Sequence, residues 1–132
     1  MSKPRYFIAV FGDPQPNKDA VDSGVYAPDP KYAPFPAKAG DVMLLYCTAS
    51  YTAHPMQVPG IGVVLGVDRE RIEYRWLPFL HPIPKSIIDA NFASGDAAKM
   101  RDIRFSSRWL FEISQLSFSK TADDRAIAWA KL

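Results

Sequence analysis

The sequence predicts an α+β domain built as a small open, mostly antiparallel β-barrel with two or three short helices. The chain has 132 residues, of which 48% are apolar and 23% charged, and this size and balance fit one compact domain over residues 1–132. Three segments with the composition of strands (42–47, 60–67 and 72–77) follow one another closely. Such spacing favours an antiparallel meander, and further strands from both ends of the chain would curl it into a barrel.

The first expected strand is the continuous apolar run Tyr6–Phe11, which stops at a Gly-Asp-Pro turn. A strand without alternation is typical of burial on both faces. A long proline-rich loop over residues 12–40 follows, with six of the twelve prolines between Pro14 and Pro36. Loops of this length are often functional in small domains. The rings in this loop either fasten it to the core or line a binding site.

The middle strands begin after a Gly40-Asp41 turn. Val42–Cys47 is again apolar throughout, whereas Gly60–Val67 carries Gly62 and Gly66 on one face. Glycine weakens a strand, so two on one face predict the close approach of another backbone, element or ligand. The next segment, 72–77, alternates between apolar and charged residues and is expected to be half-exposed.

The last third of the chain is expected to mix short helices with one strand. Two prolines precede a helix expected over 85–92, and a second weakly helical segment follows over 97–103. Residues 109–116 are expected to form a strand. Thr121, with an acidic residue three positions later, is typical of the N-cap of a final helix.

Composition excludes several classes of protein. The longest apolar runs, Val42–Cys47 and Gly60–Val67, are far shorter than the ~20 residues of a membrane span. The single cysteine, Cys47, excludes an internal disulfide framework and a cysteine-based metal site. The apolar stretch near the N-terminus is too short for a secretory leader, which favours a cytoplasmic location. No cofactor motif is present, and neither a cofactor nor a metal is expected.

The order of these features resembles the PUA-like superfamily, in particular EVE-type domains, which are related to YTH and ASCH-like domains. The resemblance rests on an aromatic first strand, Gly40-Asp41 entering a strand that contains Tyr46, a serine-containing loop, and Pro59–Val64. The Arg104–Ser106 segment is similar to an arginine-containing element near the end of the family pattern. The resemblance implies a PUA-like barrel that binds RNA or DNA, with a modified base held between aromatic side chains.

A base-binding pocket needs rings on both sides of the base and polar groups at its edge. Rings and hydroxyl groups of this kind gather in the long loop and around the exit of the second apolar strand, and each has an alternative role as a core residue or loop anchor. The candidate pocket residues are Tyr26, Tyr32, Phe35, Tyr46, Thr48, Ser50 and Tyr51.

Most of the basic residues lie in the second half of the chain. If 97–108 were helical, Arg101, Arg104 and Arg108 would share one face, and with Lys99 they are candidates for binding phosphate. The alternative is a solvated face that nearby aspartates partly neutralise. Exposed Arg71 and Arg75 could extend such a patch.

Two other functions stay open at this stage. One is a small-molecule-binding or hydrolytic domain on the same barrel, for which Cys47 and His54 flank one loop. The other is a protein-interaction domain, with Trp76 and the loop 14–36 as a contact patch. No catalytic motif is present, so a noncatalytic nucleic-acid-binding module is the leading hypothesis.

Overall fold

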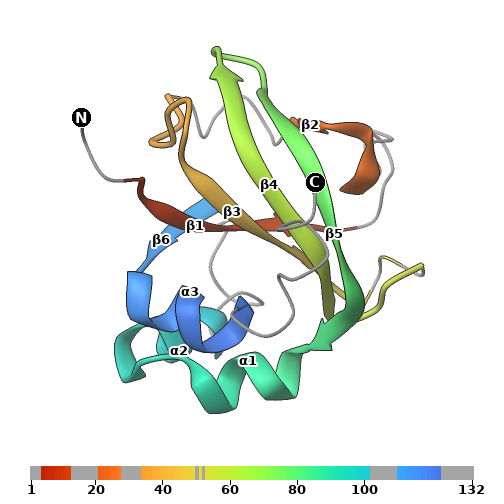
Figure 1. Ribbon diagram of the computed structural model, residues 1–132, viewed down its shortest axis with the longest axis vertical. Helices are drawn as coiled ribbons and strands as arrows, with labels where there is room; N and C mark the ends of the chain where they lie inside the picture. The colour runs from red at the N-terminus through yellow and green to blue at the C-terminus, as the bar shows by residue number, and fades with distance from the viewer. Residues whose placement is uncertain are drawn as a thin grey trace.

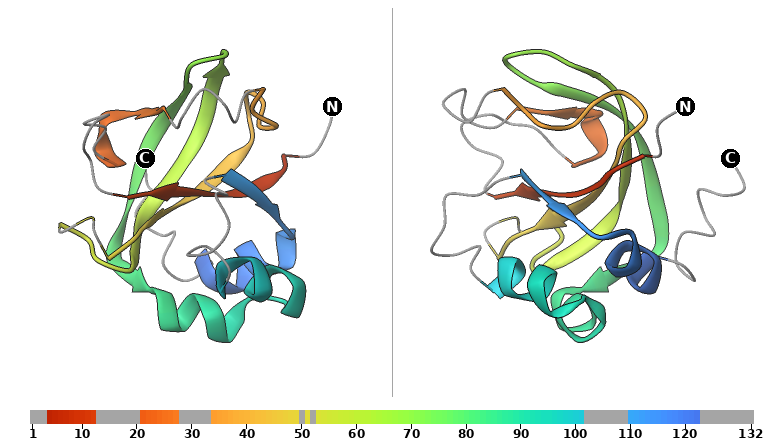
Figure 2. Two further views of the ribbon diagram at one scale, coloured as in Figure 1. Left: turned by 180° about the vertical axis from the view of Figure 1, so that it is seen from behind. Right: turned by 90° about the vertical axis from the view of Figure 1, so that its left-hand side faces the viewer.

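A curled, mixed sheet forms the framework of the chain, and helices close one end of it (Figure 1 and Figure 2). The computed structural model describes residues 4–12, 21–27, 34–49, 51, 53–101 and 110–122. Within them the sheet has six strands in the order β2-β5-β4-β3-β1-β6. This half-barrel confirms the predicted α+β open barrel. The strands are β1 (Tyr6–Phe11), β2 (Val25–Tyr26), β3 (Val42–Cys47), β4 (Gln57–Val67), β5 (Ile72–Pro84) and β6 (Leu110–Ile113).

The described helices are short. They are the 3₁₀ turn η1 (Val21–Ser23) and the α-helices α1 (Lys85–Asn91), α2 (Ser94–Arg101) and α3 (Gln115–Ala122). The helix predicted over 85–92 is confirmed as α1, and α2 covers most of the segment predicted over 97–103. Among the described residues, no helix is long and apolar enough to cross a membrane.

The predicted meander is present, because β3 pairs antiparallel with β4 and β4 pairs antiparallel with β5. Strand β1 adds a feature that the sequence did not predict. It pairs in parallel with β3, from Tyr6 opposite Val42 to Phe11 opposite Cys47, and antiparallel with β6 on its other side. Parallel neighbours need a long crossover connection, which explains the length of the segment 12–40. This segment is not all loop, since it contains η1 and the edge strand β2.

The sheet carries a hydrophobic core on each face. We call them the helix-side core and the loop-side core, because the first includes residues of α1 and α2 and the second includes residues of η1 and β2. The central strands β1 and β3 contribute to both, as expected from their continuous apolar runs. The helix-side core contains Ile8, Val10, Leu44, Tyr46, Val58, Ile61, Leu77, Phe79, Ile83, Ile88, Phe92, Ala97, Met100, Phe111 and Ile113. The loop-side core contains Phe7, Ala9, Phe11, Val21, Tyr26, Phe35, Ala37, Met43, Leu45, Cys47, Tyr51, Val64, Ile72 and Tyr74.

The Gly40-Asp41 turn joins three strands. Gly40 has a φ of 93°, a conformation that favours glycine, and its N–H donates to the carbonyl of Val64 in β4. The buried carboxylate of Asp41 accepts from the backbone N–H of Arg5 at 3.0 Å and from that of Lys38 at 2.8 Å. Its side chain therefore ties the start of β1 to the turn that begins β3.

Strand β5 is longer than predicted, because it continues past residue 77 to Pro84 and includes Pro78 and the two prolines that precede the predicted helix. The Tyr74 N–H donates outward, to the carbonyl of Gly24 beside β2. Because backbone groups alternate in direction along a strand, Pro78 also has its nitrogen on this outer edge, where no ladder bond to β4 is lost. The structure thus places Pro78 where a strand tolerates proline.

The strand predicted over 109–116 is wrong beyond Ile113, and the N-cap predicted at Thr121 is wrong, because Thr121 lies inside α3. The cap is Ser114, whose hydroxyl oxygen accepts from the Ser117 N–H at 3.1 Å. Asp96 of α2 holds this junction, since its Oδ2 accepts from the N–H and hydroxyl of Ser114 and from the hydroxyl of Ser117 at 2.6 Å. The rest of the predicted final helix, from residue 123 onward, lies outside the described part of the chain.

Asp96→Asn is expected to lower the free energy of unfolding by about 1.5–3 kcal/mol at pH 7, because hydrogen bonds to a charged acceptor are lost. Burial alone would raise the pKa of Asp96, but bonds from Ser117 and Ser114 together lower it. Stabilisation from a lowered carboxyl pKa is complete above the unfolded-state value near 4 and is lost as the pH falls through the folded-state value. The difference between wild type and variant should therefore shrink below about pH 4. Urea unfolding at several pH values measures this difference in the free energy of unfolding, with substitution of an exposed carboxylate, Glu70→Gln, as control. A difference independent of pH would contradict the charged role.

Candidate functional site

Three of the predicted pocket rings lie together in the loop-side core. Tyr26, Phe35 and Tyr51 are 3%, 8% and 6% exposed, and the Tyr26 ring lies 5.0 Å from that of Phe11. So little exposure leaves no ring face for a ligand. In the structure these three side chains anchor their loops to the sheet.

Two tyrosine hydroxyl groups hold Val21, the first residue of η1. The Val21 N–H donates to the Tyr51 hydroxyl oxygen at 2.9 Å, and the Tyr74 hydroxyl donates to the Val21 carbonyl. Burial raises the pKa of Tyr51, although the bond from Val21 acts in the opposite direction. The ring of half-buried His54 stacks on Tyr51, with the ring centres 6.1 Å apart. This grouping fixes η1 against β5.

The other predicted pocket residues do not join this group. Tyr46 faces the helix-side core, so the sheet separates it from Tyr26 and Tyr51. The Thr48 N–H donates to the carbonyl of Phe11, which continues the pairing of β1 with β3. Tyr32 and Ser50 lie outside the described residues. The seven predicted residues therefore do not line one pocket in the part of the chain that the structure describes.

A different ring, Trp76 of β5, is accessible on the loop side of the sheet. It packs against the loop-side core and is half-buried. The predicted close approach at Gly62 is confirmed, because a Cβ there would lie 2.6 Å from the Tyr74 ring, whereas Gly66 has open space. Gly60 is the second close approach, at 2.8 Å from the Trp76 indole. Sequence reasoning placed Trp76 only in a protein-contact patch. The signal that could have found it is the alternation of β5 beside a glycine-rich strand.

The predicted phosphate-binding residues are only partly described. The Lys99 ammonium donates to the carbonyl of Glu112 at 2.8 Å and lies 4.0 Å from Asp96. Lys99 thus covers a backbone carbonyl of the edge strand β6. Helix α2 ends at Arg101, whose side chain, like all of Arg104 and Arg108, lies outside the described part. The shared helical face over 97–108 stays a prediction.

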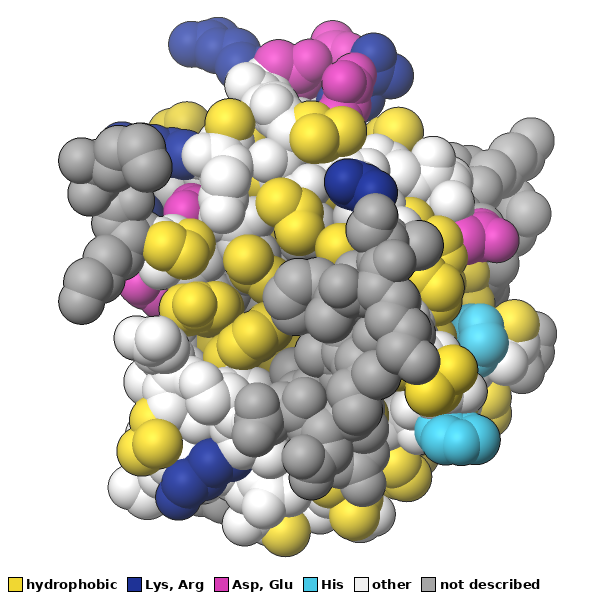
Figure 3. Space-filling view, in the orientation of Figure 1, with side chains coloured by type: hydrophobic (Ala, Val, Ile, Leu, Met, Phe, Trp, Pro, Cys, Tyr) yellow, Lys and Arg dark blue, Asp and Glu magenta, His cyan; other side chains and the backbone are white. Residues whose placement is uncertain are grey.

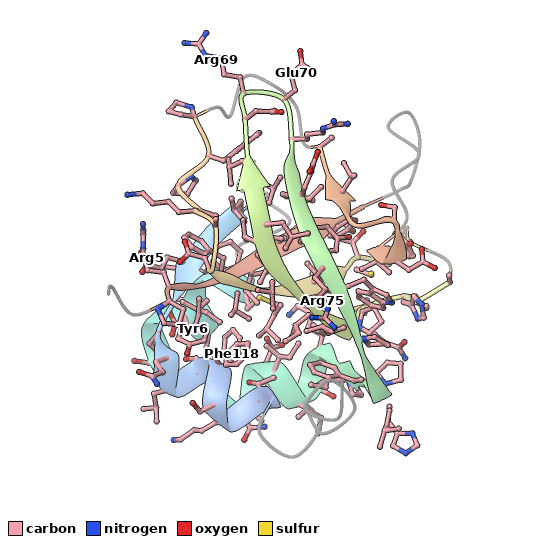
Figure 4. The ribbon with its side chains drawn as sticks, turned by 45° about the horizontal axis from the view of Figure 1, so that its top comes forward. Arg5, Tyr6, Arg69, Glu70, Arg75 and Phe118 are labelled. Atoms are coloured by element: carbon pink, nitrogen blue, oxygen red, sulfur yellow. The ribbon has the colours of Figure 1, made fainter. Side chains whose placement is uncertain are left out.

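Exposed arginines lie on β5 and at its hairpin with β4. Arg71 pairs with Glu73 at 3.3 Å, whereas Arg75 makes no ion pair among the described residues. Figure 4 shows Arg75 partway along β5, away from Arg69 and Glu70 at the hairpin tip. Figure 3 shows charged side chains gathered at this tip and apolar ones below it over the sheet. Tyr6 of β1 and Phe118 of α3 both pack against the helix-side core, and their ring centres lie 4.5 Å apart (Figure 4).

Cys47 is one candidate group for the hydrolytic alternative, and it is fully buried in the loop-side core. Burial raises the pKa of the Cys47 thiol to about 12, so the thiol is protonated near neutral pH and is a poor nucleophile. Within the described residues, no group of three or more His, Cys, Asp or Glu side chains is arranged to hold a metal ion. The burial and protonation of Cys47 do not support a mechanism in which this thiol is the nucleophile.

Cys47 should react with a disulfide reagent such as Ellman's reagent roughly a thousandfold or more slowly in the native protein than in denaturant, because it is inaccessible and protonated. Absorbance of the released chromophore measures the rate, with glutathione as the reactivity standard. Complete labelling of native protein at the rate of glutathione would contradict the burial of this thiol.

No protein-family model matches the chain, and no curated protein sequence matches it. Among solved structures, the fold is similar to that of protein Atu2648 from Agrobacterium tumefaciens, a structural genomics target. The TM-score is 0.59 at 12% sequence identity, and the match covers 91% of this chain and 92% of that one. At this identity the likeness supports the fold alone.

Proposed function

We propose that this chain is a noncatalytic PUA-like module of the EVE type that binds nucleic acid, with a plain or modified base on its aromatic face. The Gly40-Asp41 turn supports the family assignment, because the motif that carries the resemblance also joins β1, β3 and β4. The half-barrel fold is consistent with it.

The arrangement of β5 carries the functional proposal. Half-buried Trp76 lies on the loop side of the sheet. Exposed Arg75, the preceding residue of the same strand, lies on the helix side. Strand β2 pairs only with Ile72 and Glu73, so β5 is the sheet edge at Arg75 and Trp76 among the described residues. A polymer that crosses this edge can place a base against the ring and a phosphate near the guanidinium.

The test is fluorescence anisotropy of labelled RNA and DNA oligonucleotides, single- and double-stranded, with plain and modified bases, across a salt series. Affinity should fall steeply between about 50 and 200 mM salt, and Arg75→Ala should reduce the salt slope by about one. Arg101→Ala and Arg104→Ala test the predicted helical patch in the same way. Lys120→Ala on α3 removes the same charge elsewhere and is the matched control. Absence of binding to every oligonucleotide at low salt would refute the proposal.

A further inference from the structure

The indole of Trp76 lies across the bare backbone of the neighbouring strand. In the register of β4 and β5, Trp76 is opposite Gly62. Yet its far ring carbon, Cη2, lies 2.8 Å from where a Cβ on Gly60 would be, two residues further along β4. The side chain therefore extends over the strand pair instead of standing upright from it. Gly60 makes the room for this orientation, whereas the space beside Gly62 holds the ring of Tyr74.

A ring that lies against a sheet has one face on the protein and the other directed away from it. Trp76 is half-buried, whereas Tyr26, Tyr51 and Tyr74 on the same side are at most 6% exposed. The hydroxyl groups of Tyr51 and Tyr74 are also engaged with Val21. Among the described phenylalanine, tyrosine and tryptophan rings on the loop side, Trp76 is thus the one with surface available to a planar ligand.

We propose that Trp76 is the residue on which a nucleobase stacks, and that the ligand class is single-stranded nucleic acid; this rests on the proposed function. In a duplex both faces of each base are covered by neighbouring bases, so only an unpaired or flipped base can lie on an indole held against a sheet. Stacking of this kind tolerates any base, because every base has a π-face. Arg75 precedes Trp76 on the opposite side of the sheet, so it can contact a phosphate of a polymer that crosses the β5 edge.

The test compares wild type with Trp76→Ala and Trp76→Phe, using labelled oligothymidylate and oligoadenylate of about 12 nucleotides and a duplex of the same length. Trp76→Ala should weaken single-strand binding about 5- to 150-fold, the equivalent of one stacked base, and Trp76→Phe should weaken it less. Leu65→Ala removes an exposed apolar side chain from β4 and should leave affinity unchanged.

A second readout does not depend on a truncated side chain. A variant with Trp109→Phe and Trp129→Phe retains Trp76 as its only indole, and its fluorescence should be quenched as single-stranded oligonucleotide saturates it. If Trp76→Ala fails to fold, this quenching and the Trp76→Phe affinity decide the question.

The outcomes separate the two proposals. If wild type binds no oligonucleotide, the proposed function fails. If wild type binds but neither quenching nor loss of affinity at Trp76 is found, nucleic-acid binding stands and the stacking role is overturned. Duplex binding as tight as single-strand binding would overturn the single-stranded ligand class.

Discussion

Gly60→Ala is expected to lower the free energy of unfolding by about 1–3 kcal/mol, the range for overpacking a tightly packed site. The added Cβ would lie 2.6 Å from the Leu77 carbonyl oxygen and 2.8 Å from the Pro78 Cα. These are backbone atoms of a paired strand, so β4 and β5 must move apart to relieve the contact. Urea unfolding monitored by circular dichroism gives the change.

Gly66→Ala is the matched control, because it lies on the same strand with no atom within 4 Å of its Cβ position. Its stability should be unchanged or slightly raised, since alanine reduces the freedom of the unfolded chain. Equal losses at the two positions would show that strand flexibility, and not the close approach of β5, is responsible.

Asp41→Ala is expected to have the second large effect, a loss of about 2–4 kcal/mol. The substitution leaves the N–H groups of Arg5 and Lys38 without their acceptor at a largely buried junction. Asp41→Asn retains one acceptor oxygen and should lose about half as much. Chemical unfolding of both variants measures the difference.

Asp68 provides a control with the same number of bonds but different exposure. Its carboxylate accepts from the N–H groups of Glu70 and Arg71 at 2.7 and 2.9 Å in the exposed β4–β5 turn. Water can replace these bonds, so Asp68→Ala should destabilise the protein far less. If Asp41→Ala were no worse than Asp68→Ala, the junction would not depend on the buried carboxylate.

Local pattern was sufficient for the elements whose burial is uniform or strictly alternating. The runs Tyr6–Phe11 and Val42–Cys47 were predicted as doubly buried strands because they have no polar face, and both are confirmed. A local pattern does not show which strands pair with one another. The parallel pairing of β1 with β3 depends on where the crossover returns, and the two residues of β2 are too few to show a period.

The end of β6 was also predicted wrongly, for a different reason. Residues 114–116 directly follow an apolar-rich segment and end in a leucine, and the strand was expected to extend over them. The turn into α3 is instead fixed by Ser114 and by Asp96, which is eighteen residues away in the sequence. A cap that depends on a distant carboxylate leaves little local signal.

The candidate site was predicted by residue type but not by orientation. Aromatic residues were expected to matter, and Tyr26, Phe35 and Tyr51 do, as anchors in the loop-side core. The accessible ring is Trp76, and its position over the sheet depends on Gly60 of another strand. The contact between Trp76 and Gly60 cannot be read from the sequence of either strand alone, because it depends on the register in which β4 and β5 pair.

The position of β1 between β3 and β6 also sets the order in which the sheet can be completed. Its two neighbours begin 36 and 104 residues after it in the chain. During synthesis β1 emerges first, yet its edge toward β6 has no partner until residues 110–113 have been made. Contacts so distant in sequence are typical of slow-folding topologies. A nascent chain therefore carries an open apolar strand edge until residues 110–113 have been made, and such an edge favours pairing with other chains.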